Sequence, residues 1–275
     1  NLERKLFIHW CQWLCTPHLS QKQEERAKAL FQSIAREMEG QFSHQEGPWL
    51  DNTHANPTAP GSADVVFIPY VERMNASLAY YKGLDIRQEH PQINNWFKAL
   101  EQLETYRGTQ GDFHTHAHDL PPQMGGCWSH LNQKQERFSN AIDIGSGLGE
   151  QETSWSEAQE KSERQSIVVA LTKVLKHRKR LMGLNPLGPD KFDQPLRATL
   201  TSMMLDSPCA PHQGSAIGLR YLRDRISVPR DMPLLSARSL RKALERTAQI
   251  DGPSIGLSIP TNNRLDQNPA PFLSK

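Results

Sequence analysis

Apolar residues recur every three or four positions along most of the chain, which is the period of an amphipathic α-helix. No segment alternates apolar and polar residues as a half-buried strand does. We therefore predict an all-α protein: a helical bundle, a linker, and a second helical region. The segments with helical period are 2–15, 20–40, 62–82, 91–107, 163–182, 193–205, 214–226 and 235–250.

The segments between these helices lack a clear period. Residues 47–61 contain three prolines with several Asn, Thr and His residues, which is typical of a loop. We interpret 108–127 as a loop or extended strap, and 128–160 as a polar stretch with a glycine-rich break. Residues 251–275, at the end of the chain, show no hydrophobic periodicity, which predicts an extended tail.

Charge divides the chain into two halves. Residues 1–160 hold 13 Lys and Arg against 21 Asp and Glu, whereas residues 161–250 hold 17 against 7. An acidic half joined to a basic half predicts two modules that bind different partners or attract each other. The predicted organisation is a helical domain with a His-rich strap, a polar linker, a basic helical region and a tail. Their bounds are 1–126, 127–160, 161–250 and 251–275.

The sequence has few features that indicate a membrane segment or redox chemistry. No run of about 18 apolar residues exists, so we expect no transmembrane helix and a soluble protein. The four cysteines have neither zinc-ribbon nor Cys-x-x-Cys spacing, which predicts free thiols in a reducing compartment. Cys11 and Cys15 are four residues apart in a predicted helix and so share a face.

Three features between residues 47 and 107 resemble the C-terminal domain of glutathione S-transferases. They are the turn GPWL at 47–50, an Ala-Asp pair that opens the apolar helix 62–82, and an aromatic helix after His90-Pro91. The resemblance extends over 1–107. Two later strings, 112–127 and 219–232, resemble a subset of these transferases from cyanobacteria, algae and plants.

This resemblance implies an all-α domain and particular residue roles. In the family a Ser or Thr caps the core helix, and an Asp three residues later bonds back to it. Here Gly61 holds the cap position before Asp64, so only the Asp half of this reciprocal capping box is kept. If Gly61 is the cap, Gly61→Ser should recover part of the stability lost in Asp64→Ala. The candidate family-motif or substrate-wall residues are Asp64, Glu72, Arg73, Tyr81 and Trp96.

The resemblance also implies where glutathione would bind. In the family a thioredoxin-like domain precedes the helical domain, holds glutathione and carries the activating Ser, Tyr or Cys. No strands for such a domain are predicted in this chain. We therefore expect no cofactor bound by this chain alone, and glutathione only where an N-terminal domain lies upstream of Asn1.

The resemblance and the expected absence of a thioredoxin-like domain leave two functional hypotheses. The first is a glutathione S-transferase-like protein, non-catalytic as it stands, that acts as a binding or scaffold subunit of a larger assembly, in a plastid or photosynthetic setting. The second is the C-terminal portion of an active glutathione transferase, which contributes the apolar co-substrate wall. The expected location is the chloroplast stroma, the thylakoid surface or the cytoplasm.

Alternating histidines form a candidate metal site. In an extended segment His114, His116 and His118 would point the same way and reach one metal ion. The alternative is that these side chains cap helices or bond across a loop.

Candidate partner contacts lie in both halves. The stretches 108–160 and 251–275 lack the apolar period for cores of their own, so we expect them to order against a partner protein. The basic residues of 173–180 suit a lipid headgroup or an acidic protein, or else a solvated helix end. Nucleic acid is not expected, because the arginines of 220–246 lack interleaved aromatic residues. The candidates are Phe113, Trp128, Lys176, Arg178, Lys179, Arg180 and Phe272.

Overall fold

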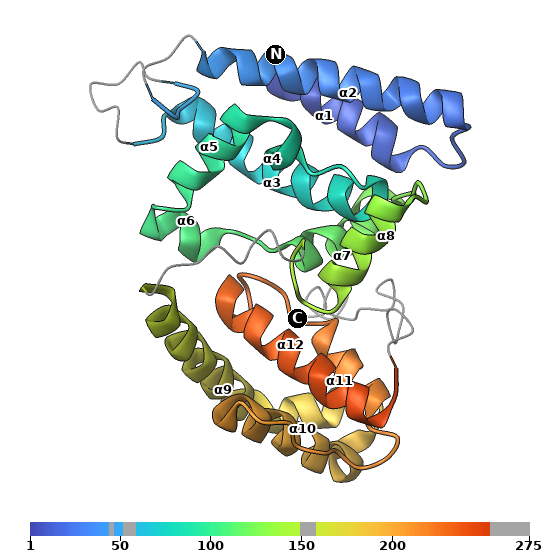
Figure 1. Cartoon of the computed structure of the whole chain (residues 1–275), viewed down its shortest axis with the longest axis vertical. Helices are drawn as coiled ribbons and strands as arrows, with labels where there is room; N and C mark the ends of the chain where they lie inside the picture. Colours follow the sequence, from blue (N-terminus) through green and yellow to red (C-terminus); the bar gives the residue numbers. More distant parts are fainter. Residues whose placement is uncertain (44–46, 52–58, 149–157, 254–275) are drawn as a thin grey trace, which may run out of the picture. The chain divides into compact units, whose positions relative to one another are not determined.

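The computed structural model describes residues 1–43, 47–51, 59–148 and 158–253. Within these ranges the chain forms twelve helices and no strand, which confirms the all-α prediction (Figure 1). No helix in this described part has the length and apolarity to cross a membrane. The helices are α1 Leu2–Cys15, α2 Gln21–Phe42, α3 Ser62–Lys82, α4 Ile86–Glu89, α5 Pro91–Leu100, α6 Glu104–Thr109, α7 Phe113–Met124, α8 Gln133–Asp143, α9 Ala158–Leu184, α10 Gly188–Leu205, α11 Ala216–Arg223 and α12 Leu234–Asp251.

The chain divides into two compact units, Asn1–Ser139 and Asn140–Lys275. The division falls inside α8. Each unit has a hydrophobic core of its own, one built from α1 to α7 and the other from α9 to α12.

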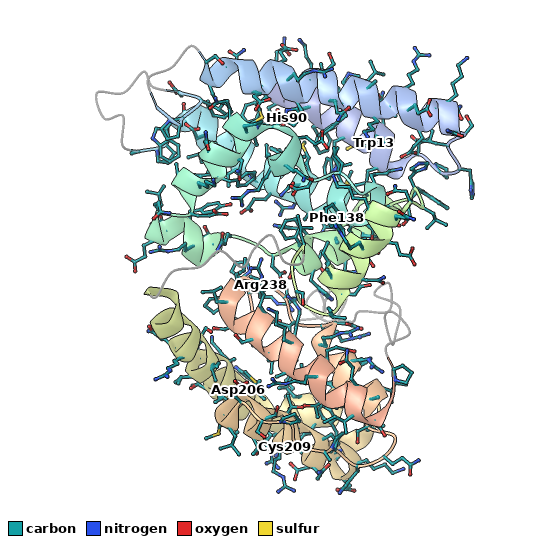
Figure 2. All side chains as sticks on the ribbon, in the orientation of Figure 1. Trp13, His90, Phe138, Asp206, Cys209 and Arg238 are labelled. Carbon is teal, nitrogen blue, oxygen red and sulfur yellow. The ribbon has the colours of Figure 1, made fainter. Side chains whose placement is uncertain are left out.

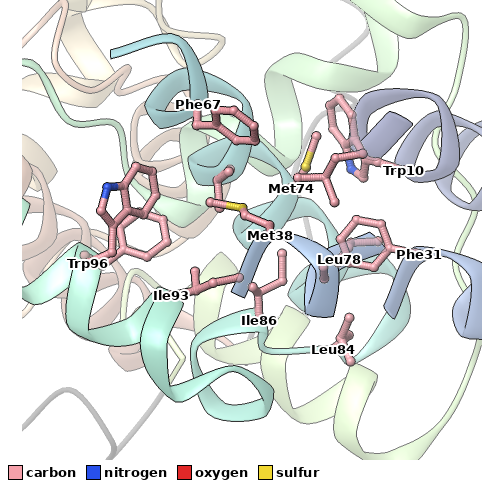
Figure 3. Close-up of a cluster of buried hydrophobic side chains, with 14 of the residues drawn as sticks. Trp10, Phe31, Met38, Phe67, Met74, Leu78, Leu84, Ile86, Ile93 and Trp96 are labelled. Atoms are coloured by element: carbon pink, nitrogen blue, oxygen red, sulfur yellow. The ribbon is translucent and has the colours of Figure 1, made fainter. Parts of the chain in front are cut away.

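The core of the first unit is rich in aromatic residues. Trp10 and Trp13 from α1, Phe31 from α2 and Trp96 from α5 are each at most 2% exposed. Figure 3 shows Met38 and Met74 between Trp96 on one side and Trp10 and Phe31 on the other. Burying one such side chain contributes about 1.5–3 kcal/mol, so this apolar cluster holds the unit together.

Helix α3 runs through the centre of this unit and packs against α1, α4 and α7. It continues through Pro69 to Lys82, and Gly83 ends it with a left-handed φ of 69°. A Cβ at Gly83 would lie 2.7 Å from the main-chain nitrogen of Gln135, so only glycine fits there. Glycine is needed both for the helix end and for the close approach of the start of α8.

Two segments expected to be irregular contain helices. Residues 113–124 form α7, whose N-cap Asp112 accepts a 2.9 Å bond from the N–H of Thr115. The expected linker contains α8, and Asn132 accepts a 2.9 Å bond from the N–H of Gln135 at its start. The strap prediction was wrong because two histidines of α7 occupy buried positions, and counting histidine as polar hides the helical period.

The four helices of the second unit agree with the helices expected between 161 and 250. Phe192 and Leu196 of α10 and Leu244 of α12 are fully buried in its core. Charged side chains are also buried here: Arg223, Asp224 and Arg241 are each 0% exposed. The expected tail from 254 onward, with Phe272, lies outside the described residues.

Candidate functional site

Asp64 joins three parts of the first unit. Its carboxylate accepts bonds from the main-chain N–H groups of Leu50 and Gly61, each at 2.8 Å. It also accepts a 2.7 Å bond from the indole N–H of Trp96. Asp64 and Trp96 are both 0% exposed. The bond from Gly61 confirms the expected half of the capping box, but Asp64 and Trp96 form a buried anchor and cannot line a substrate wall.

Glu72 of α3 lies in a polar cluster with residues of α6 and α7. One carboxylate oxygen accepts a 2.6 Å bond from the hydroxyl of Tyr106, and the other lies 3.7 Å from Nε2 of His116. Burial, and next the charge of Glu72, raise the pKa of Tyr106 above its usual value. Tyr106 therefore stays a neutral hydroxyl that donates to the carboxylate.

The His116 ring occupies a tight place in this cluster. A Cβ at Gly111 would lie 2.2 Å from its Nε2, so the chain needs glycine at 111 to admit the ring. The Nε2 atom is buried and has no hydrogen-bond partner in the structure. The cluster therefore brings together a carboxylate, a neutral phenol and an imidazole from three helices.

The remaining two family-motif candidates, Arg73 and Tyr81, bond to main-chain oxygens outside the Glu72 cluster. Arg73 donates to the main-chain oxygen of Pro69 at 2.7 Å, along its own helix. The hydroxyl of Tyr81 donates to the main-chain oxygen of Ala117 at 3.0 Å and ties α3 to α7. Tyr81 is 8% exposed, so it supports packing and is not part of a substrate wall.

The three histidines do not share one face, which corrects the metal-site prediction as it was made. His114 and His118 are one helical turn apart on the buried side of α7, with ring centroids 4.5 Å apart. His116, between them in sequence, turns toward Glu72. The prediction used the two-residue period of an extended segment, whereas the helix separates i from i+2.

Only some of the expected partner-binding residues are exposed and free to contact a partner protein in this structure. Phe113 is half-buried in the first unit, and Trp128 is 38% exposed with its ring 4.7 Å from that of His18. Arg178 already bonds to Asp193, and this bond lowers the pKa of that carboxyl. The basic run has three further cations that are exposed: Lys176, Lys179 and Arg180. Figure 2 shows the described side chains of both units.

The family comparison agrees with this geometry. Residues 21–113 match the family model of the glutathione S-transferase C-terminal domain. The first unit contains a glutathione S-transferase C-terminal-like domain. The match runs from the start of α2 to the first residue of α7 and includes Asp64, Glu72 and Trp96. Neither the curated proteins nor the solved structures gave a match, and the finer resemblance to cyanobacterial, algal and plant transferases is not supported.

Two features of this unit were not expected from the sequence. Lys82 forms a buried ion pair with Glu24, with a nitrogen–oxygen distance of 3.0 Å. Glu24 also accepts a 2.5 Å bond from the indole N–H of Trp13. The partners are 58 and 11 residues apart, so no local pattern signals them; a charged residue inside an apolar period is the one available clue.

Proposed function

We propose that the protein is a glutathione S-transferase-like binding protein, non-catalytic as this chain stands, and that its first unit binds a partner protein through the outer face of α3. The observation that carries this proposal is the exposure of two adjacent aliphatic residues. Val65 is 62% exposed and Val66 is 50% exposed, in the first turns of the helix. Solvated helix faces normally hold polar residues, and contiguous exposed apolar residues favour a protein contact.

The neighbouring residues extend this face along the helix. Tyr70 is one turn beyond Val66 and half-buried, and its ring packs edge-on against Phe7 of α1 at 5.7 Å. Arg73 is a further turn along the same stripe. An aromatic residue and an arginine beside an aliphatic patch are the residue types that dominate protein interfaces. In the transferases that this unit resembles, this helix lies near the cleft beside the thioredoxin-like domain.

A photocrosslinking experiment tests the proposed face. Benzoylphenylalanine at position 66 is expected to give one discrete crosslinked protein in the source cells. Position 168 is the matched control, because Val168 of α9 is a similarly exposed valine on a helix, at 61% exposure. Val66→Asp should abolish a crosslink formed from position 70. No adduct from position 66, or the same set of adducts from 66 and 168, would reject the face.

Glutathione binding separates this proposal from the transferase alternative. We expect the chain to show no heat of binding with millimolar glutathione in titration calorimetry and no conjugation of a chlorodinitrobenzene substrate. The reason is that the described residues form no strand, whereas glutathione transfer requires a thioredoxin-like site. Saturable binding in the micromolar range would establish the alternative, in which the same face is the co-substrate wall.

A further inference from the structure

Three of the four cysteines lie together in the first unit. Cys11 and Cys15 belong to α1, and Cys127 follows α7; all three are half-buried and pack against the core of this unit. The main-chain N–H of Trp128 donates to the carbonyl oxygen of Leu14, with a nitrogen–oxygen distance of 2.9 Å. This bond joins the peptide unit after Cys127 to the peptide unit before Cys15.

The main-chain bond sets the separation of two thiols. Because the bond joins the peptide units that flank Cys15 and Cys127, it holds these two residues beside each other. A disulfide spans a Cα separation of about 4.4–6.8 Å. The pKa of each thiol is shifted most strongly by the other thiol, which places the two side chains next to each other. The backbone therefore needs little movement to bring the sulfurs into bonding distance.

The surroundings shift the pKa values of the Cys15 and Cys127 thiols in opposite directions. The hydrogen bond from Cys127, and then the charge of Lys82, lower the pKa of the Cys15 thiol against the opposing effect of burial. Lys82 is 6% exposed and stays next to this group because Glu24 holds its ammonium. Burial raises the pKa of Cys11 to about 11, and the hydrogen bond to Cys15 raises that of Cys127. Cys15 is therefore the thiol that ionises first.

We propose that Cys15 and Cys127 are a peroxide-sensitive thiol pair that closes reversibly to an intramolecular disulfide. The thiolate of Cys15 attacks one oxygen of a hydroperoxide: an S–O bond forms, the O–O bond breaks, and the leaving alkoxide or hydroxide takes a proton from water. The sulfur of Cys127 then attacks that of Cys15, so the S–S bond forms and the S–O bond breaks. Hydroxide leaves and takes the proton of Cys127 as water. Two thiols lose two electrons, and the peroxide gains them.

Closing this pair covalently fastens the end of α1 to the segment after α7. The loop between Cys15 and Cys127 includes most of the first unit, and closing a long loop restricts the unfolded chain strongly. The oxidised first unit should therefore unfold at a higher temperature than the reduced one. A dithiol reductant reverses the change.

Mass spectrometry of the full chain tests the pair. After brief exposure to hydrogen peroxide and alkylation of the remaining thiols, we expect one linked peptide pair, Cys15 with Cys127, and loss of two hydrogens per chain. Dithiothreitol should restore both free thiols. In Cys127→Ser, dimedone should label a sulfenic acid at Cys15, whereas Cys15→Ser should leave Cys127 unlabelled.

Two other cysteines provide the controls. Cys209→Ser, in the second unit, and Cys11→Ser, on the same helix face as Cys15, should both leave the disulfide yield unchanged. A link from Cys11 to Cys127, or sulfinic acid at Cys15 without any disulfide, would overturn the assignment. Circular dichroism confirms that each serine variant is folded, and alkylation of the unoxidised wild type at pH 7 gives an independent measure. The alkylating reagent should modify Cys15 at least about tenfold faster than Cys127. Equal alkylation rates at the two thiols would also overturn the proposal.

Discussion

Asp64→Ala is expected to lower the free energy of unfolding of the first unit by about 3–5 kcal/mol. The alanine would leave three donors without an acceptor: the part-buried N–H of Leu50, the buried N–H of Gly61 and the buried indole of Trp96. Each buried donor without a partner costs about 1–3 kcal/mol. Urea unfolding followed by tryptophan fluorescence measures the loss, because five of the six tryptophans belong to this unit.

An exposed aspartate provides the matched control for Asp64. Asp190 stands in the first turn of α10 and is exposed, so Asp190→Ala removes only a favourable charge near a helix N-terminus. That loss should be about 0.3–1 kcal/mol, read from the circular dichroism transition of the second unit. If Asp64→Ala costs no more than Asp190→Ala, the three bonds contribute nothing measurable.

We expect that Gly61→Ser will not repair this helix end, in contrast to the expectation from the capping pattern. Gly61 is the N-cap, as expected. A Cβ at this position, however, would lie 2.7 Å from the main-chain oxygen of Asp51. Asp51 occupies the space that a serine side chain needs, so we expect this substitution to destabilise the unit.

The sequence was sufficient for the long, regular helices but insufficient for α7, for α8 and for the contacts that join the helices. The periods of α1, α2, α3 and α5 are long and regular, and the capping role of Asp64 follows from a three-residue spacing. The bond from Asp64 to Trp96 spans 32 residues, and no local pattern encodes it. The approach of His116 to Glu72 spans 44 residues and depends on α7 being helical, which the sequence reading missed.

Net charge gave an incomplete picture of the second unit. The excess of cations between 161 and 250 led us to expect a basic module that binds its own partner or attracts the acidic half. In α11 and α12, however, Arg220, Arg223 and Arg241 are at most 5% exposed. The guanidinium of Arg241 donates to the main-chain oxygens of Arg223 and Ile226. Composition counts these cations as surface charge, whereas tertiary packing uses them inside.

Glu245→Gln is expected to destabilise the second unit by about 3–5 kcal/mol. Arg220 bonds to both oxygens of this carboxylate at 3.1 Å, and Arg223 bonds to one of them. Burial by itself would lower the pKa of Arg223, but Asp224 and then Glu245 outweigh it and raise that pKa. Removing one partner of a buried ion pair leaves an uncompensated charge, which costs about 3–5 kcal/mol.

An exposed ion pair in the same unit provides the control. Asp206 is paired with Arg246 at 3.4 Å, but its side chain is 94% exposed. Asp206→Asn makes the same carboxylate-to-amide change and should cost at most about 1 kcal/mol. Thermal unfolding by circular dichroism and amide hydrogen exchange in α11 and α12 compare the two variants. Equal, small losses would mean that Asp224 and the main-chain oxygens suffice for the buried arginines; a large loss only in Glu245→Gln would show that this carboxylate holds α11 against α12.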